Sequence, residues 1–196
     1  MWFTVPDGLH ALPIAATAEE RTALADAFVR ELYPNGDDAL WAASAPYYGV
    51  VGQFMSGTGL SFSAMGFFAR DDGGVVHCTF TVASVASGHA SVEAAANGIR
   101  EVLVRDPAND ARWVDLPCGP GVSCTTLREF TVPAELTADG TETKLHTGQI
   151  QVHVPFPTGP YVALFTLDTA ALDHWGEFCE MTAAIMRTVS FTEPPE

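Results

Sequence analysis

Lysine is almost absent from this chain. Lys144 is the only one, and with eight arginines it stands against 24 acidic residues, which gives a formal net charge of −15. A field of this sign repels nucleic-acid phosphates and anionic lipid headgroups. We therefore expect neither nucleic acid nor a membrane surface as a partner, and favour a basic protein or a cation. The alternative is that the acidity only keeps the protein in solution.

Long hydrophobic runs are also missing. Pro6, Asp7, His10 and Pro13 interrupt the first part of the chain, which has no basic region and no unbroken apolar stretch of signal-peptide length. No later segment approaches the roughly 18 apolar residues of a membrane span. The sequence therefore predicts a cytoplasmic protein.

Cysteine is too scarce for a disulfide-dense scaffold. There are four cysteines and no Cys-x-x-Cys motif, so free thiols are expected. Cys118 and Cys124 bracket a Gly-Pro-Gly turn, and a hairpin there would bring them close enough to bridge or to share redox chemistry. Ordinary buried thiols are the alternative, and the sequence leaves the question open.

Recognisable catalytic and metal motifs are absent. There is no Gly-x-Ser-x-Gly elbow, phosphate loop or dinucleotide fingerprint. His146 and His153 are seven residues apart in one predicted strand, which puts them on opposite faces. His174 and Glu177 share a helix face, where such a pair is more often a solvated contact than half of a metal site. We expect no metal and no cofactor, and favour a protein without catalysis.

The composition is that of a folded domain. Apolar residues make up 47% of the chain and charged residues 17%, which suits one domain over residues 1–196 with a frayed tail at 191–196. The alanine-rich composition, with arginine in place of lysine, is typical of high-GC bacteria.

Two helical regions are predicted near the start. Thr17 and Glu20 have the spacing of a capping box and open a helix over residues 17–33. A second helical stretch begins near Asp38, and Pro46 is expected to break it into two helices. The later of these two should turn one apolar stripe inward: Tyr47, Val50, Val51, Phe54 and Met55.

Three predicted hairpins follow, separated by a helix over residues 91–105. The first has Asp71-Asp72-Gly73-Gly74 at its turn. The paired segments are 60–70 with 75–86, 111–117 with 122–132, and 144–154 with 160–168. A last helix is expected to begin at Asp168 or Thr169 and to pack through Trp175 and Phe178. The fold class is thus α+β, a mainly antiparallel sheet of six or seven strands packed by helices as an α/β/α sandwich.

Both ends of the chain carry a known pattern. Residues 3–9 (FTVPDGL), residues 161–167 (YVALFTL) and the helix end at 185–191 (IMRTVSF) resemble the PsbP-like fold family. That family includes the photosystem II extrinsic subunit, the Ran-binding Mog protein and small actinobacterial lipoproteins. The resemblance implies an α/β/α sandwich that serves as a binding or assembly module, and it transfers no site residues.

The last hairpin carries the predicted binding face. With a five-residue loop over 155–159, Val154 opposes Pro160, and one face becomes a core face. The opposite face then mixes aromatic area with hydrogen-bonding groups, which suits recognition. It consists of Gln149, Gln151, His153, Tyr161 and Phe165. We predict a partner interface or a ligand pocket on this face, although a covering helix is an equal alternative.

The leading functional hypothesis is a cytoplasmic bacterial binding or assembly domain that recognises a protein partner. One alternative is a small enzyme or ligand-binding protein with an apolar pocket between sheet and helices, using Cys118, His146 or His153. Another is an acidic immunity or inhibitor protein that covers a basic surface. A flat apolar patch would favour the first, a deep pocket with converging polar groups the second, and a clustered acidic face the third.

Overall fold

One antiparallel sheet of seven strands and four α-helices form the structure, an α+β fold as predicted. It is a computed structural model, and it describes residues 1–70 and 73–193. The elements in chain order are β1 (Leu9–Ala11), α1 (Ala18–Leu32), α2 (Asp38–Ser56), β2 (Leu60–Ala69), β3 (Val75–Ala86), α3 (Val92–Leu103), β4 (Asn109–Leu116), β5 (Gly119–Val132), the 3₁₀ turn η1 (Ala134–Leu136), β6 (Thr143–Pro155), β7 (Tyr161–Thr169), the 3₁₀ turn η2 (Leu172–His174) and α4 (Trp175–Thr188).

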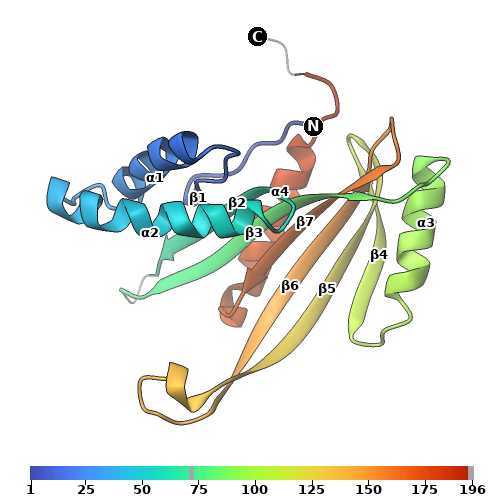
Figure 1. Ribbon diagram of the computed structural model, residues 1–196. Helices are drawn as coiled ribbons and strands as arrows, with labels where there is room; N and C mark the ends of the chain where they lie inside the picture. The colour runs from blue at the N-terminus through green and yellow to red at the C-terminus, as the bar shows by residue number, and fades with distance from the viewer. Residues whose placement is uncertain (71–72, 194–196) are drawn as a thin grey trace.

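The strand order across the sheet is β1-β2-β3-β7-β6-β5-β4. The three predicted hairpins are confirmed as β2–β3, β4–β5 and β6–β7, although Asp71 and Asp72 of the first turn lie outside the described residues. The β3–β7 pairing joins the strands of the first half of the chain to those of the second. All described strands therefore share one sheet (Figure 1).

The face of the sheet that packs against α4 holds the main core, and we call it the α4 face. Its strands contribute fully buried side chains such as Phe80, Phe165 and Leu167. Helix α4 adds Phe178, Ile185 and Met186, and Val189, its C-cap, packs with them. The predicted packing through Trp175 and Phe178 is confirmed, since Phe178 is buried in this core and the partly buried Trp175 packs against it.

The opposite face, which we call the open face, is covered only at its two ends. Helices α1 and α2 pack on each other and contact β1 and β2, while α3 contacts β4, β5 and β6. In Figure 1, α4 lies behind the sheet and the other helices lie on the near side, so the middle strands face the viewer between α2 and α3. The predicted sandwich is therefore complete on one face and interrupted on the other.

Helix α2 is continuous, so the predicted break at Pro46 is wrong. A proline inside a helix leaves the carbonyl four residues earlier without its hydrogen bond. That carbonyl belongs to Ala42, and both Ala42 and Pro46 are exposed, so the freed group is accessible to solvent. The first helix is confirmed, with the capping box of Thr17 and Glu20 in place.

The predicted inward stripe of this region is also wrong. Tyr47, Val50 and Phe54 are 67%, 65% and 73% exposed, and only Val51 and Met55 are partly buried. The packed side of α2 is turned the other way, because the short Ala45 and Gly52 let it approach α1 and the β1 region closely. The second core of the protein forms there, from Leu12, Ala25, Phe28, Val29 and Ala45.

The last helix begins later than predicted. Strand β7 continues to Thr169, which pairs with Gly148, and the Thr169 hydroxyl donates to the carbonyl of His77 at 2.8 Å. These bonds hold Thr169 in the sheet, so the chain turns through η2 before α4 starts at Trp175.

The register of the β6–β7 hairpin differs from the predicted one. Val154 pairs with Ala163, not with Pro160, and Val152 pairs with Phe165. The shift is three residues, and an odd shift moves every side chain of one strand to the other face. This register places Phe165 in the core beside Phe3 and Phe80, where its ring area is removed from water.

The first and last described segments meet at one side of the molecule. Trp2 and Ser190 exchange two backbone hydrogen bonds, of 2.8 and 2.9 Å. Phe191 packs on Phe156 with ring centroids 4.9 Å apart, so the predicted frayed tail does not begin at residue 191. The remainder of that tail, residues 194–196, lies outside the described residues.

Candidate functional site

Between α2 and α3 the open face presents the middle of the sheet to solvent. Strand pairing aligns its side chains in three rows that cross β3, β7 and β6. The rows are Ala83–Leu164–His153, Thr81–Thr166–Gln151 and Thr79–Asp168–Gln149. Gln149 alone is fully buried, and none of the nine is lysine or arginine. This floor is therefore apolar near His153 and hydrogen-bonding or acidic near Asp168.

The predicted binding face is divided by the true register. Gln149, Gln151 and His153 do share the open face of β6. Tyr161 and Phe165 belong to the other face of the sheet: Phe165 is 1% exposed in the core, and Tyr161 touches Phe156 beside the hairpin turn. The five residues thus do not form one surface, and a binding role for the remaining three stays a prediction.

Strand β6 holds three buried polar atoms that have no hydrogen-bond partner among the described residues. They are Thr147 Oγ1, Gln149 Oε1 and His153 Nε2. The amide nitrogen of Gln149 is satisfied, since it donates to Asp168 Oδ1 at 2.8 Å. All three unpaired atoms lie on the open face. An unpaired buried polar group costs about 1–3 kcal/mol, so a bound molecule that pairs with it gains affinity.

His153 is the titratable group at the apolar end of the floor. Burial lowers the pKa of His153 below its ordinary value. The ring is therefore neutral at pH 7, with one nitrogen that donates and one that accepts. His153 opposes Leu164 on one side and Val122 on the other, which places it at the apolar end of the floor.

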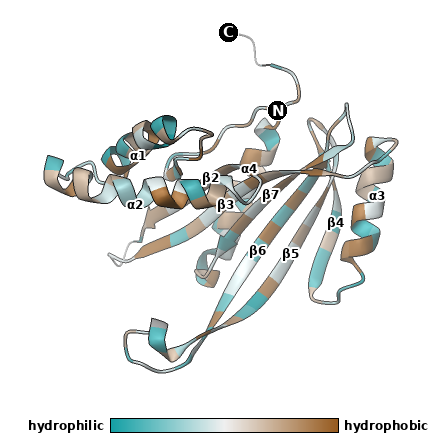
Figure 2. Ribbon diagram, in the orientation of Figure 1, coloured by the Kyte–Doolittle hydropathy of each residue, from teal (hydrophilic) through white to brown (hydrophobic). Residues whose placement is uncertain are grey.

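Helix α2 forms the wall on the β2 side of the open face. Leu40, Tyr47 and Phe54 recur every seven residues, and Ala43 and Val50 fall three residues after the first two. This is the a/d spacing by which one helix packs against another. Yet all five are exposed, because α2 packs on α1 and the sheet through Trp41, Ala45, Tyr48, Gly52 and Met55. We call the exposed five the α2 stripe, and Figure 2 shows brown, hydrophobic segments along α2.

Sequence reasoning missed the α2 stripe as a surface because it assigned part of it to the core. The seven-residue spacing was the available signal. A helix with two apolar stripes, one a/d-spaced and one lined by small residues, has two packing partners. Within the described residues α2 packs through one of them only.

The cysteines give no sign of shared chemistry. All four are free, and Cys118 and Cys124 are separated along β5 and its turn, so the hairpin does not bring them together. Burial raises the pKa of each thiol, to about 11 for Cys78. A raised pKa keeps a thiol protonated and weakly nucleophilic.

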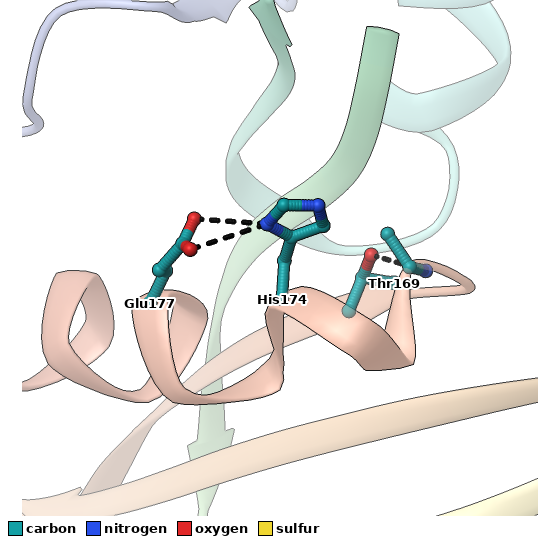
Figure 3. Close-up of polar contacts among 4 residues, drawn as sticks. Thr169, His174 and Glu177 are labelled. Carbon is teal, nitrogen blue, oxygen red and sulfur yellow. Dashed lines mark hydrogen bonds and ion pairs between the residues drawn. The ribbon is translucent and has the colours of Figure 1, made fainter. Parts of the chain in front are cut away.

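The histidine pairs are local contacts. At the start of α4, His174 Nδ1 lies 3.1 Å from Glu177 Oε2, and the Glu177 side chain is 76% exposed (Figure 3). His146 Nε2 lies 3.1 Å from Glu129 Oε2 on the other face from His153. Among residues 1–70 and 73–193 no three His, Cys, Asp or Glu side chains gather as a metal site would require.

Comparison with known proteins identifies no relative of this chain. No known protein family, no characterised sequence and no solved structure matches the chain. The PsbP-like resemblance therefore stays a prediction. In the part of the chain that the structure describes, no helix combines the length and hydropathy needed to cross a membrane.

Proposed function

We propose that this protein is a cytoplasmic, non-catalytic binding domain whose open face receives an amphipathic helix of a partner protein. The observation that carries the proposal is the α2 stripe. Contiguous exposed aromatic and aliphatic side chains mark interaction sites. Their a/d spacing specifies a helical partner, because a helix interdigitates with a seam of that period.

The position of the stripe fits a helix lying on the sheet. Val50 lines the groove between α1 and α2, whereas Tyr47 and Phe54 lie outside that groove, on the second flank of α2. Since α1 contacts β1 and α2 contacts β2, the second flank is turned toward β3 and β7. From β2 to β5, the middle of the strands under α3, there are four strand spacings, or about 19 Å. A helix of ~10 Å diameter between α2 and α3 would complete this layer.

Charge specifies the partner further. The chain carries 15 more acidic than basic residues, and the floor of the open face has Asp168 but no lysine or arginine. Asp37 and Asp38 stand at the first turn of α2, and Glu93 at that of α3. We therefore propose a partner helix with one apolar side flanked by lysine and arginine, which complementary fields steer to this surface.

Photo-crosslinking tests the proposal at a defined position. We would replace Tyr47 by p-benzoylphenylalanine, with Tyr161 as the matched control, because Tyr161 is 46% exposed but lies on the α4 face of the sheet. The Tyr47 position should form one adduct in extracts of the source organism, and the Tyr161 position should not. The crosslinked peptide should map to a helical segment rich in lysine or arginine.

A synthetic peptide of that segment supplies the quantitative test. It should gain helicity on binding, and Tyr47→Ala with Phe54→Ala should weaken it about a hundredfold, as expected for two interface anchors. Leu127→Ala, which truncates a 60% exposed residue on the α4 face, is the control and should have no effect. Equal adducts at both positions, an adduct with a second copy of this chain, or an unaffected double variant would each reject the partner helix.

A further inference from the structure

A second concavity lies under α3, on the other wall of the open face. It has a volume of about 520 Å³, within the usual range for small-molecule sites. One wall is a flank of α3 that is largely exposed to solvent, the floor is His153 of β6, and Ser87 and His89 of the β3–α3 connection stand at the rim. The α3 residues that line it are Ala94, Ala95, Gly98, Ile99, Val102 and Leu103. None of them belongs to α2, so the cleft shares no residue with the α2 stripe.

The cleft combines an apolar wall with one unpaired polar atom. Nε2 of His153 is buried and has no hydrogen-bond partner among the described residues. The rim residues are already paired with each other, since Ser87 Oγ lies 2.5 Å from His89 Nδ1. His153 is therefore the group that would meet a polar atom of a bound molecule, while α3 would cover its apolar body.

The residues that line the cleft also indicate whether that molecule is charged. It contains no lysine, arginine, aspartate or glutamate. An ionised ligand group placed against His153 would be removed from water without a counter-charge, which is strongly unfavourable. A hydroxyl or carbonyl avoids this loss and pairs with a neutral imidazole as donor or acceptor.

Small side chains on α3 leave the space in which such a molecule fits. A Cβ added at Gly98 would find no atom within 4 Å, although this glycine lines the cleft in the middle of a helix. Glycine weakens a helix interior by up to about 1 kcal/mol relative to alanine. Its presence here leaves open space in this wall of the cleft, at a cost in helix stability.

We propose that the cleft under α3 binds an uncharged, mainly apolar small molecule with one hydroxyl or carbonyl group, which hydrogen-bonds to Nε2 of His153. The ligand class covers phenols, ketones and hydroxylated hydrocarbons.

Three probes with the same ring system test the ligand class on the full chain. They are 2-naphthol, naphthalene and naphthalene-2-carboxylate, titrated at pH 7 and followed by NMR of the His153 ring and the α3 amides. We expect 2-naphthol to bind about tenfold or more tighter than naphthalene, since one well-placed hydrogen bond to a buried group gives that ratio. The carboxylate should bind weakest. Equal binding of the carboxylate, or no binding of 2-naphthol at its solubility limit, would overturn the proposal.

Two variants separate the hydrogen bond from the cavity. His153→Leu keeps a side chain of similar bulk, so it should retain naphthalene binding but lose the preference for 2-naphthol. Gly98→Leu should fill the cleft and abolish binding of both, while the better helix former preserves the fold. Asn97→Leu, at an exposed position of α3 outside the cleft, is the control and should change neither. An unchanged preference in His153→Leu, or unchanged affinity in Gly98→Leu, would reject the site.

Discussion

Helices α4 and α2 lie on opposite faces of the same sheet and use their apolar residues differently. Helix α4 inserts Phe178, Ile185 and Met186 into the main core, each at most 3% exposed. Helix α2 is longer, yet Tyr47 and Phe54 are more than two-thirds exposed. Burial of an aromatic side chain contributes stability, whereas a contiguous exposed set is available to another molecule. The α4 face therefore stabilises the fold, and the open face retains the surface that can bind.

The N-termini of the helices also differ between the two faces of the sheet. The three helices of the open face start with a capping side chain, from Thr17, Asp37 and Ser91 respectively. The N-cap of α4, His174, makes no side-chain cap hydrogen bond. Helices that bury little tertiary surface depend more on local hydrogen bonds, since packing normally supplies most helical stability. In the open-face helices, side-chain caps thus supply part of the stability that α4 gains from packing.

The largest expected effect comes from replacing one phenylalanine on each face of the sheet by alanine. Phe178→Ala removes a core ring that contacts Phe68, and should lower the free energy of unfolding by about 3–5 kcal/mol. Phe54→Ala should change it by no more than about 0.5 kcal/mol. Urea denaturation of both variants measures the difference. A large loss in Phe54→Ala would show that the α2 stripe is part of the fold.

Two glycines give the next comparison. Gly148 packs under the indole of Trp175, and a Cβ there would lie 2.3 Å from Trp175 Cζ3. Gly148→Ala should therefore destabilise by about 1–3 kcal/mol through overpacking. Gly98→Ala, in open space on α3, should stabilise by up to about 1 kcal/mol. Thermal unfolding of both variants should shift in opposite directions, and equal shifts would contradict the contact with Trp175.

Removal of a cap tests the dependence of the open-face helices on local bonds. The Ser91 hydroxyl accepts from the amide of Ala94 at 3.1 Å. Ser91→Ala should cost about 1 kcal/mol and speed hydrogen exchange across α3. Ser91→Asp restores an acceptor and should recover the loss. Unchanged exchange in the alanine variant would show that packing alone holds α3.

The smallest effect is a pH dependence of the open face. Because burial lowers the pKa of His153 in the folded state, the unfolded state binds more protons as the pH falls through about 6.5. Stability from this group is thus present above that pH and is lost below it. Between pH 7 and pH 5, His153→Leu should lose less unfolding free energy than the wild type. The exposed His146→Leu is the control, and a loss equal to that of the wild type in both variants would remove the claim.

Much of the fold followed from local sequence signals. Turn residues and alternating apolar runs located the hairpins, and capping residues located the first helix. The β6–β7 register did not follow, since Val162, Leu164, Phe165 and Leu167 make both faces of β7 apolar. With such a run, alternation does not select a face, and the packing of Phe165 against Phe3 decides it.

The candidate site was predicted only in part for the same reason. Alternation along β6 does separate Gln149, Gln151 and His153 from the core valines, so those three residues were found. The α2 stripe depends on how α1, α2 and the sheet pack together, which involves residues far apart in the sequence. The cleft under α3 likewise needs the β3–α3 connection beside β6.

The β3–β7 pairing has a consequence for how the chain folds. Four of the six strand pairings close short loops, but β3–β7 joins residues such as Thr79 and Asp168, and encloses α3 and three strands between them. Closing so large a loop loses chain entropy before any contact compensates it, and such topologies fold slowly. Until the pairing forms, β3 and β7 are edge strands with unpaired backbone groups, the form in which chains associate with one another. The centre of the finished sheet is therefore its most aggregation-prone part during folding.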